Sequence, residues 1–299
     1  MLTFDDAVLQ KHYDEYLSPL LIKNKYGLKN PTGCQGRATF YVSLAHTQFD
    51  LVKILFNHGS EIGCHTIDHV KLPRANSSYA EKEITKQIAY FKNKMKQKTN
   101  HKKLVDEIHG FRAPYLHVAG DLQFDVLRKS GYVYDSSILN NRIWRNKQPI
   151  WPYTLDYPVS SKECWNPPCN TKPYPQFWEI PLNALRDARG SACSMLDDCL
   201  VRKDNKRNTA EDWFMLLKNN FYDYFYEYRI PMPLYTHAAL FDRDSSAYDG
   251  LVLFLKYVLE KKNVWMIQQK QLIQYLRRPI SNNQMKKEYF ACHERDSSK

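Results

Sequence analysis

The chain has 299 residues, a formal net charge of +11 and a hydrophobic fraction of 43%, and this length suits one large domain or two ordinary ones. No run of about 18 apolar residues occurs, so the sequence predicts no membrane-spanning helix. The basic clusters at 92–103 and 202–207 carry no nucleic-acid-binding motif and are typical of solvated helix faces or loops. We therefore expect no nucleic-acid partner.

Strand-like and helix-like segments alternate along most of the chain. Runs of β-branched and aromatic residues predict strands at 1–4, 37–43, 60–66, 105–115, 177–182, 232–238 and 264–269. Apolar residues at helical spacing predict helices at 46–59, 79–98, 121–132, 208–229 and 250–263, after an amphipathic stretch at 8–21. Gly59 and Gly131 are the expected stops of two helices. The long helix at 208–229 should bury one face, made of Trp213, Leu217, Tyr224 and Tyr228.

This alternation favours a parallel sheet, and the number and spacing of the strands suit a (β/α) barrel, complete or incomplete. In such barrels the functional residues gather at the carboxyl ends of the strands. The segment 149–205 interrupts the alternation and is rich in Pro, Trp, Tyr and Cys, so we expect a Cys-stapled insertion over one face. We predict one catalytic domain at 1–280, which includes this insertion, and a C-terminal tail at 281–299.

The seven cysteines bear on the redox environment. Two close pairs lack the CxxC spacing of zinc sites and predict disulfides, which implies an oxidising compartment: Cys164 with Cys169, and Cys193 with Cys199. We expect Cys64 to be a small buried thiol. The partners of Cys34 and Cys292 stay open, since they could pair with each other or with cysteines upstream of this chain.

The beginning of the chain bears on its location. The apolar run at 1–4 is short for a strand buried in a sheet, so we expect further residues, with a signal peptide, upstream of Met1. Asn76 begins an acceptor sequon for N-glycosylation, which fits a secreted, extracellular protein.

Chemically active side chains follow several of the predicted strands. Asp5 and Asp6 end the first strand, and His65 and His69 follow the third. Two histidines four residues apart suit a divalent metal, although an isolated pair is often merely solvated. Thr66 stands where the HExxH pattern of zinc proteases has its glutamate, so a base and a third ligand must come from elsewhere. The two acids offer both, because adjacent strand residues point to different sides.

Further strand ends complete this group with Arg112, Tyr115 and His237. Taken singly, the two acids could begin a helix as capping residues, and His237 could be a structural histidine. Together, at the ends of successive strands, these residues indicate one site.

Four ordered motifs resemble the polysaccharide deacetylase family, also known as the NodB-homology family or carbohydrate esterase family 4. TFDDA (3–7), HTIDH (65–69), RAPY (112–115) and YTHA (235–238) match its first, second, third and last motifs. NPTGC, ATFYVS, FWEIPLN and CSMLDDC are similar to arthropod chitin deacetylases more than to bacterial peptidoglycan enzymes. The resemblance implies an α/β fold, the deformed (β/α) barrel of the NodB type.

The resemblance also assigns roles to individual residues. The metal ligands would be Asp6, His65 and His69, and the metal most often zinc, with other divalent transition metals as alternatives. The catalytic residues would be Asp5 as general base, Arg112 orienting Asp5, His237 as general acid, and Tyr115, whose backbone N–H helps to hold the oxyanion.

The expected substrate contacts are less sharply defined. WPYTLDY (151–157) aligns loosely with the family's fourth motif, so one of Trp151, Tyr153, Asp156 and Tyr157 would wall the acetate pocket or contact Arg112. Tyr235 replaces the leucine usual in the last motif and would shape the acetyl pocket. The substrate-binding candidates are Trp151, Tyr157 and Tyr235. Trp165 and Trp178 could stack on sugars, although Trp is more often a core residue.

The resemblance predicts a secreted, monomeric enzyme that removes N-acetyl groups from chitin or chitooligosaccharides, giving acetate and glucosamine units. One alternative is another acetylated polysaccharide, such as peptidoglycan or acetylxylan. A second is a carbohydrate-binding or matrix protein on the same fold with weak catalysis, against which the fully occupied catalytic positions argue.

Overall fold

The computed structural model describes residues 1–74, 77–204 and 206–290, and its centre is a curled sheet of eight strands. The strand order is β12-β1-β2-β3-β4-β5-β8-β7. The strand bounds are β1 (Leu2–Asp6), β2 (Ala38–Val42), β3 (Glu61–Cys64), β4 (Gly110–Phe111), β5 (Tyr134–Asp135), β7 (Tyr153–Thr154), β8 (Trp178–Glu179) and β12 (Leu234–His237). Neighbouring strands are parallel except β7, which runs antiparallel to β8. Since β12 and β7 remain as edges, the predicted barrel is confirmed in its incomplete form.

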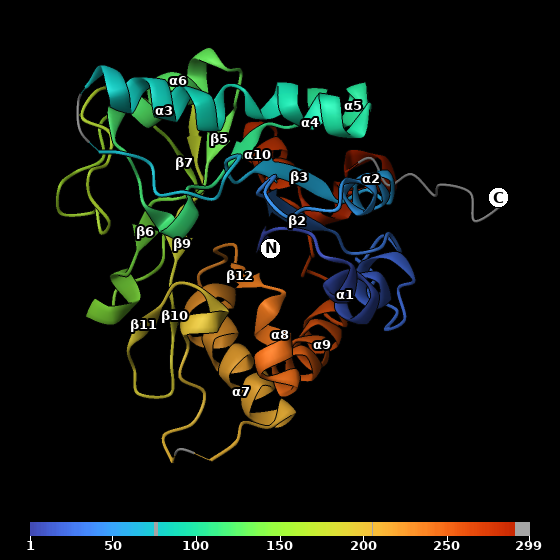
Figure 1. Ribbon diagram of the computed structural model, residues 1–299. Helices are drawn as coiled ribbons and strands as arrows, with labels where there is room; N and C mark the ends of the chain where they lie inside the picture. Colours follow the sequence, from blue (N-terminus) through green and yellow to red (C-terminus); the bar gives the residue numbers. More distant parts are fainter. Residues whose placement is uncertain (75–76, 205, 291–299) are drawn as a thin grey trace.

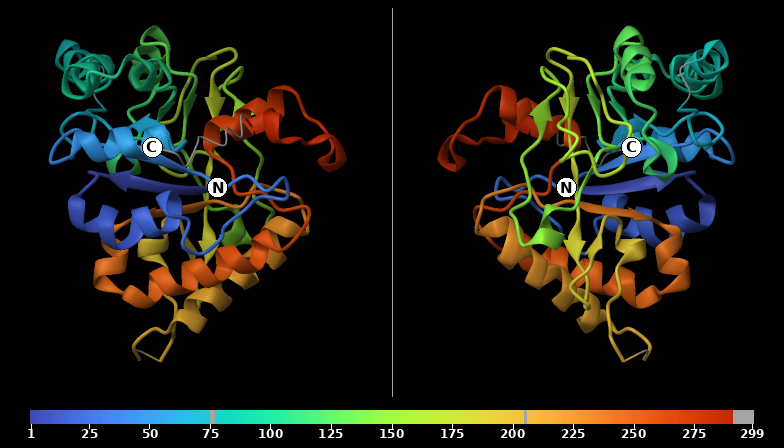
Figure 2. Two further views of the ribbon diagram at one scale, coloured as in Figure 1. Left: turned by 90° about the vertical axis from the view of Figure 1, so that its right-hand side faces the viewer. Right: turned by 90° about the vertical axis from the view of Figure 1, so that its left-hand side faces the viewer.

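Helices pack around this sheet, with α3 to α6 on one side of the strands and α7 to α9 on the other (Figures 1 and 2). The helix bounds are α1 (Gln10–His12), α2 (Phe49–Asn57), α3 (Ser78–Ile88), α4 (Phe91–Thr99), α5 (Lys102–Asp106), α6 (Asp121–Lys129), α7 (Ala210–Asn220), α8 (Ala239–Arg243), α9 (Ser245–Leu259) and α10 (Gln269–Arg277). Gly59 and Gly131 follow α2 and α6 with φ of +90° and +72°, in the left-handed region that glycine adopts without strain. None of the described helices is long and apolar enough to cross a membrane.

Short helical turns connect these elements. They are η1 (Tyr13–Ile22), η2 (Pro114–Leu116), η3 (Arg142–Arg145), η4 (Leu196–Asp198), η5 (Phe221–Tyr226), η6 (Asn282–Gln284) and η7 (Lys287–Phe290). The amphipathic stretch expected at 8–21 is mostly η1, a π-helix that contains Pro19. Proline lacks the N–H that an α-helical bond needs, which favours a change of winding there.

The helix predicted at 79–98 is two helices, α3 and α4, separated by a turn at Ala89 and Tyr90. The break lets each half pack on a different neighbour: α3 contacts α6, whereas α4 contacts α2. Ile84, Ile88, Phe91 and Met95 recur at helical spacing in this stretch and are all buried, so the spacing predicts the inward face although the helix is not continuous.

The long helix predicted at 208–229 is also divided, into α7 and the π-helix η5. Trp213 and Leu217 are buried as expected, but Tyr228 is exposed. Phe221 and Phe225 take the buried positions instead. The wider winding of a π-helix, with bonds from i to i+5, moves the inward face away from the 3.6-residue period that predicted Tyr228.

The strand predicted at 264–269 is wrong. Met266 uses its N–H and its carbonyl oxygen to bind the side chain of Asn30, at 2.7 Å and 3.1 Å. Its carbonyl also accepts from the Arg37 N–H. Because these backbone groups are already paired, the segment does not join the sheet, and α10 begins at Gln269.

The insertion contributes to two small sheets: β9 (Leu182–Asn183) pairs with β6 (Leu139–Asn140), which precedes the insertion, and β10 (Leu185–Arg186) pairs with β11 (Ala192–Cys193). Both predicted disulfides form within the insertion, Cys164–Cys169 and Cys193–Cys199. Cys64 is a buried free thiol, as predicted, and Cys34 is disulfide-bonded. Cys292 and Asn76 lie outside the described residues.

The interior of the curled sheet holds aromatic side chains from β2 and β5. Tyr41 of β2 and Tyr134 of β5 are fully buried there. Side chains at Gly63 and Gly110 would collide with them, because a Cβ at Gly110 would lie 2.2 Å from the Tyr134 ring. These two glycines therefore leave the room that the large residues occupy.

Candidate active site

The candidate site is assembled at the carboxyl ends of the parallel strands. Asp5 and Asp6 end β1, and Asp5 is in register with His237 at the end of β12. Asp6 has φ +81°, which turns the chain away from the strand. Such a conformation is strained in a residue that has a Cβ, so the surrounding structure must hold it.

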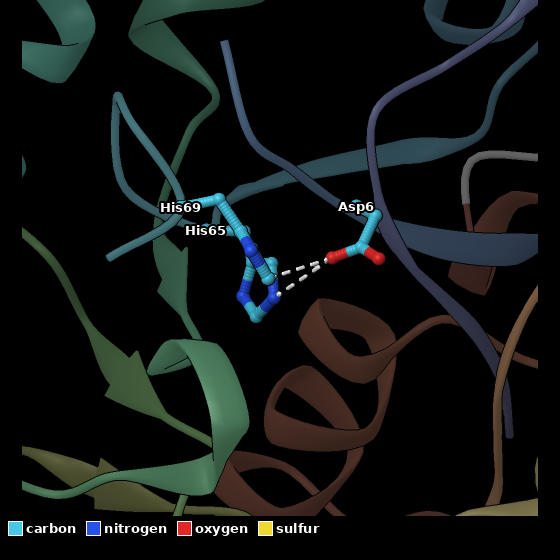
Figure 3. A group of neighbouring side chains, drawn as sticks. All are labelled: Asp6, His65 and His69. Atoms are coloured by element: carbon cyan, nitrogen blue, oxygen red, sulfur yellow. Dashed lines mark ion pairs between the residues drawn. The ribbon is translucent and has the colours of Figure 1, made fainter. Parts of the chain in front are cut away.

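The side chains of Asp6, His65 and His69 converge (Figure 3). Asp6 Oδ1 lies 2.9 Å from Nε2 of His69 and 3.5 Å from Nε2 of His65. One nitrogen or oxygen of each residue can be chosen so that all lie within 4.8 Å of one another. The histidines share a loop rather than a helix, and Thr66 accepts a hydrogen bond from the His69 N–H at 3.1 Å.

These residues fit a divalent cation. Asp6 Oδ1 is buried and makes no hydrogen bond of good geometry with any described residue, although it faces two imidazole rings. Burial alone would raise the pKa of Asp6, but its contacts with His65 and His69 and the charge of His237 lower it well below the ordinary value. An anionic oxygen beside two imidazoles is a ligand set that binds zinc and other transition metals.

The tautomer of His65 supports the same interpretation. Its Nδ1 lies 2.8 Å from the carbonyl oxygen of Arg112, which can only accept a hydrogen bond. Nδ1 therefore carries the hydrogen, and Nε2 presents its lone pair toward Asp6. Metal-binding histidines commonly have their second nitrogen fixed in this way.

Asp5 and Arg112 form a buried ion pair behind the cluster. Arg112 Nη1 donates to Asp5 Oδ1 at 2.7 Å, and their side chains are 0% and 2% exposed. The guanidinium lies between the rings of Tyr41 and Tyr235, 4.1 and 4.5 Å from their centroids. Burial is the largest effect and lowers the pKa of Arg112, but the charge of Asp5, aided by both tyrosines, raises it above the usual value.

His237 is held by an acid that the sequence analysis did not single out. Asp197 Oδ2 lies 3.2 Å from His237 Nδ1 and accepts the His237 backbone N–H at 3.2 Å. Arg243 donates to the other oxygen of Asp197 at 2.8 Å. Burial lowers the pKa of His237, but Asp197 and the charges of Asp5 and Asp6 raise it to about 9. His237 Nε2 is thereby directed toward Asp6 Oδ2, 3.8 Å away.

One signal could have identified Asp197. It lies in CSMLDDC, between the two cysteines of the second predicted disulfide. A disulfide between cysteines six positions apart holds this loop in place, so its two acids could have been treated as further candidate site residues.

Tyr115 lies at the rim of the site. It occupies η2 with φ +57°, and its ring is 62% exposed and 4.8 Å from the His69 ring. The first N–H groups of a helical turn have no partner within that turn. The backbone N–H of Tyr115 is thus well suited to donate to a bound molecule.

The proposed substrate contacts lie in different places. Tyr235 is only 2% exposed, and its hydroxyl donates to the Pro181 carbonyl. Its ring packs against the Arg112 guanidinium. Tyr157 is 82% exposed and borders a surface pocket near Glu163. Trp151 lines an apolar cavity of about 430 Å³ with Met1 and Leu2.

Since Leu2 begins β1 and Met1 precedes it, Trp151 lies at the end of the sheet opposite Asp5 and Asp6. Asp156 binds Thr154 and the Gln176 N–H, whereas the hydrogen bonds of Arg112 go to Thr3, Asp5 and Ser136. The structure thus gathers the proposed ligands and catalytic residues but places Trp151 away from them. Trp165 contacts Arg145, and Trp178 lies in β8.

Known proteins share both the sequence pattern and the fold. A family model described as polysaccharide deacetylase matches residues 1–134. Chitin deacetylase 8 of Bombyx mori is 28% identical over 280 residues, covering 93% of this chain and 70% of that protein. Chitin deacetylase 1 of the same moth is 27% identical over 291 residues, covering 93% of this chain and 50% of that protein. The chain thus spans only half of its second relative.

Two solved structures support the fold assignment. A protein from Mycobacterium smegmatis assigned to the polysaccharide deacetylases has a TM-score of 0.55 at 17% identity, over 92% of this chain and 89% of that one. A family 4 acetyl xylan esterase from Clostridium thermocellum, crystallised with a cobalt ion, has a TM-score of 0.51 at 15% identity, over 94% and 93%. These likenesses confirm the predicted NodB-type α/β architecture.

Proposed function

We propose that this chain is a member of the polysaccharide deacetylase family, whose model matches residues 1–134, and that it removes N-acetyl groups from chitin or chitooligosaccharides. The observation that carries the proposal is the convergence of Asp6, His65 and His69 beside Asp5 and His237. The similarity to two moth proteins named chitin deacetylases favours chitin over other acetylated polysaccharides.

Asp6, His65 and His69 would hold the metal, and we propose zinc, since two imidazoles and a carboxylate with further open positions are typical of catalytic zinc. When bound there, such an ion lowers the pKa of water and polarises a carbonyl oxygen. The acetyl xylan esterase crystallised with cobalt shares this fold, so metal analysis rather than geometry must decide the element.

The proposed proton transfers use the two residues that flank the ligands. Asp5 pairs with Arg112 through Oδ1 and would accept a proton from the attacking water. His237, held by Asp197, would donate a proton from Nε2 to the leaving nitrogen, because an amide anion does not depart. The Tyr115 N–H would donate to the oxyanion, and the loss of one such donor typically costs about a hundredfold or more in rate.

We propose that the enzyme is secreted and acts as a monomer. The two disulfides within the insertion support an oxidising compartment, because such bonds are rare where thiols are kept reduced.

The direct test is acetate release by purified protein from chitooligosaccharides, acetylxylan and peptidoglycan. We expect the highest kcat/KM on chitooligosaccharides, and a loss of activity in Asp5→Asn with metal content unchanged. Preferred hydrolysis of another polymer would overturn the substrate assignment. Binding to chitin without acetate release by the metal-loaded protein would favour the carbohydrate-binding alternative.

A further inference from the structure

Two carboxyl groups that the proposed reaction does not use face each other inside the sheet. Asp135 in β5 and Glu179 in β8 are paired in register on adjacent parallel strands, and both are 0% exposed. Because paired residues on neighbouring strands project to the same face of the sheet, their carboxyl groups are neighbours, and each affects the pKa of the other. Two ionised carboxylates in such contact, away from water, would repel strongly.

The hydrogen bonds around the pair are unequal. Asp135 accepts three: from the Ser137 N–H at 2.8 Å, the Ser137 hydroxyl at 2.9 Å and the Gln123 amide at 3.0 Å. Glu179 Oε1 accepts one from the Ile138 N–H at 3.1 Å. The other oxygen, Glu179 Oε2, is buried and has no hydrogen-bond partner among the described residues. Hydrogen bonds donated to a carboxylate favour its ionised form, so Asp135 is the better anion.

We propose that Asp135 and Glu179 share one proton, carried on Glu179 Oε2 and donated to Asp135, and that the pair positions Arg112. With this proton, Glu179 Oε2 gains a hydrogen-bond partner, and the pair carries one negative charge. Among the described residues, Arg112 is a cation whose charge acts on Asp135, and Tyr153 and Tyr235 are neutral titratable groups near the pair. Burial and the charge of Asp135 raise the pKa of Glu179 well above its usual range.

The pair is connected to the candidate active site through Ser136 and Ser137. Ser137, bound twice by Asp135, accepts the Ala113 N–H on its hydroxyl at 2.8 Å. Ser136 accepts Arg112 Nε on its carbonyl at 2.9 Å and Arg112 Nη2 on its hydroxyl at 3.0 Å. Arg112 in turn donates to Asp5. The acid pair therefore fixes the position of Ser136 and Ser137, which bind Arg112 and its neighbour Ala113. Arg112 in turn orients Asp5, the proposed base.

Two conservative substitutions separate the roles of the two acids. Glu179→Gln keeps an acceptor for Ile138 and replaces the shared proton with an amide donor toward Asp135. Asp135→Asn leaves one oxygen where the carboxylate had two, so it cannot accept every hydrogen bond from Ser137 and Gln123. We expect Glu179→Gln to be tolerated and Asp135→Asn to loosen Arg112.

The protonation state is tested by infrared spectroscopy of the whole protein at neutral pH, with hydrogen–deuterium exchange to identify the carbonyl stretch of a protonated carboxylic acid. We expect this band in the wild type and in the control Asp106→Asn, which changes an exposed acid of α5, and its loss in Glu179→Gln. A wild type without the band, or a band that persists in Glu179→Gln, would overturn the shared proton.

The positioning role is tested by acetate release from chitooligosaccharide, and this readout rests on the proposed function. We expect kcat of Glu179→Gln within about threefold of wild type, and that of Asp135→Asn at least tenfold lower at similar KM. A large loss of kcat in Glu179→Gln, or full activity in Asp135→Asn, would overturn the role. If Asp135→Asn does not fold, kcat of Glu179→Gln tests the positioning role and the infrared band tests the shared proton. Absence of acetate release by the wild type would refute the proposed function. The infrared band would still show whether Asp135 and Glu179 share a proton.

Discussion

The ion pair of Asp5 and Arg112 yields a sharp prediction for the variant Arg112→Met. This substitution keeps an apolar stem between Tyr41 and Tyr235 but removes the guanidinium. Asp5, whose side chain is 2% exposed, would then be left as a buried charge without its partner.

The expected magnitude follows from that burial. Removal of one partner from a buried ion pair typically costs about 3–5 kcal/mol in unfolding free energy. For a chain of this size each kcal/mol lowers Tm by about 2–4 °C, so we expect a fall in Tm of about 10 °C. The exposed pair of Lys102 and Asp106 is the matched control, and Lys102→Met should change Tm little.

The assay is urea unfolding of metal-free protein in a double-mutant cycle with Asp5→Asn. The double variant Asp5→Asn/Arg112→Met has no charge at either position, so it leaves no unpaired buried ion. Its loss of unfolding free energy should be about 2 kcal/mol smaller than the sum of the losses in the two single variants. Strict additivity, or a loss below about 1 kcal/mol for Arg112→Met, would refute the buried pair as described here.

Three further predictions concern the parts that hold this pair and His237. Asp197→Asn should lower kcat about tenfold or more at similar KM, because a general acid contributes at least about a hundredfold and depends on its orientation; steady-state acetate release measures this. The double variant Cys193→Ser/Cys199→Ser should lower the unfolding free energy by about 2 kcal/mol, the loop entropy of a short closed ring, and denaturant titration checks it. Folded protein keeps a proton on Glu179 that the unfolded chain releases as pH rises above its ordinary pKa. Wild type should therefore lose about 1.4 kcal/mol of unfolding free energy per pH unit relative to Glu179→Gln, from about pH 5 up to the pKa in the folded state. Parallel pH dependences of the two proteins would contradict it.

The features that could be predicted are those with a local physical cause. Gly59 and Gly131 end helices because they adopt positive φ without strain. Asp5 and Asp6 could be placed at a strand end because the apolar run before them is continuous, and the carboxyl ends of parallel strands meet at one edge.

The features that were missed depend on tertiary contacts. The segment at 264–269 has a strand-like composition, but the Asn30 side chain takes the backbone groups of Met266. Trp151 is aromatic and close to an expected motif in sequence, yet it packs with Met1 at the far end of the sheet. Asp197 joins His237 across 40 positions, so its partner is known only once the fold brings the CSMLDDC loop beside the end of β12.

Metal titration tests directly whether Asp6, His65 and His69 act as one ligand set. Calorimetry of metal-free protein with zinc should show one tight site in the wild type and in the control His58→Ala, whose histidine lies on the surface beyond α2. His65→Ala and His69→Ala should each bind zinc at least about tenfold more weakly. Unchanged zinc affinity in either variant would contradict the account.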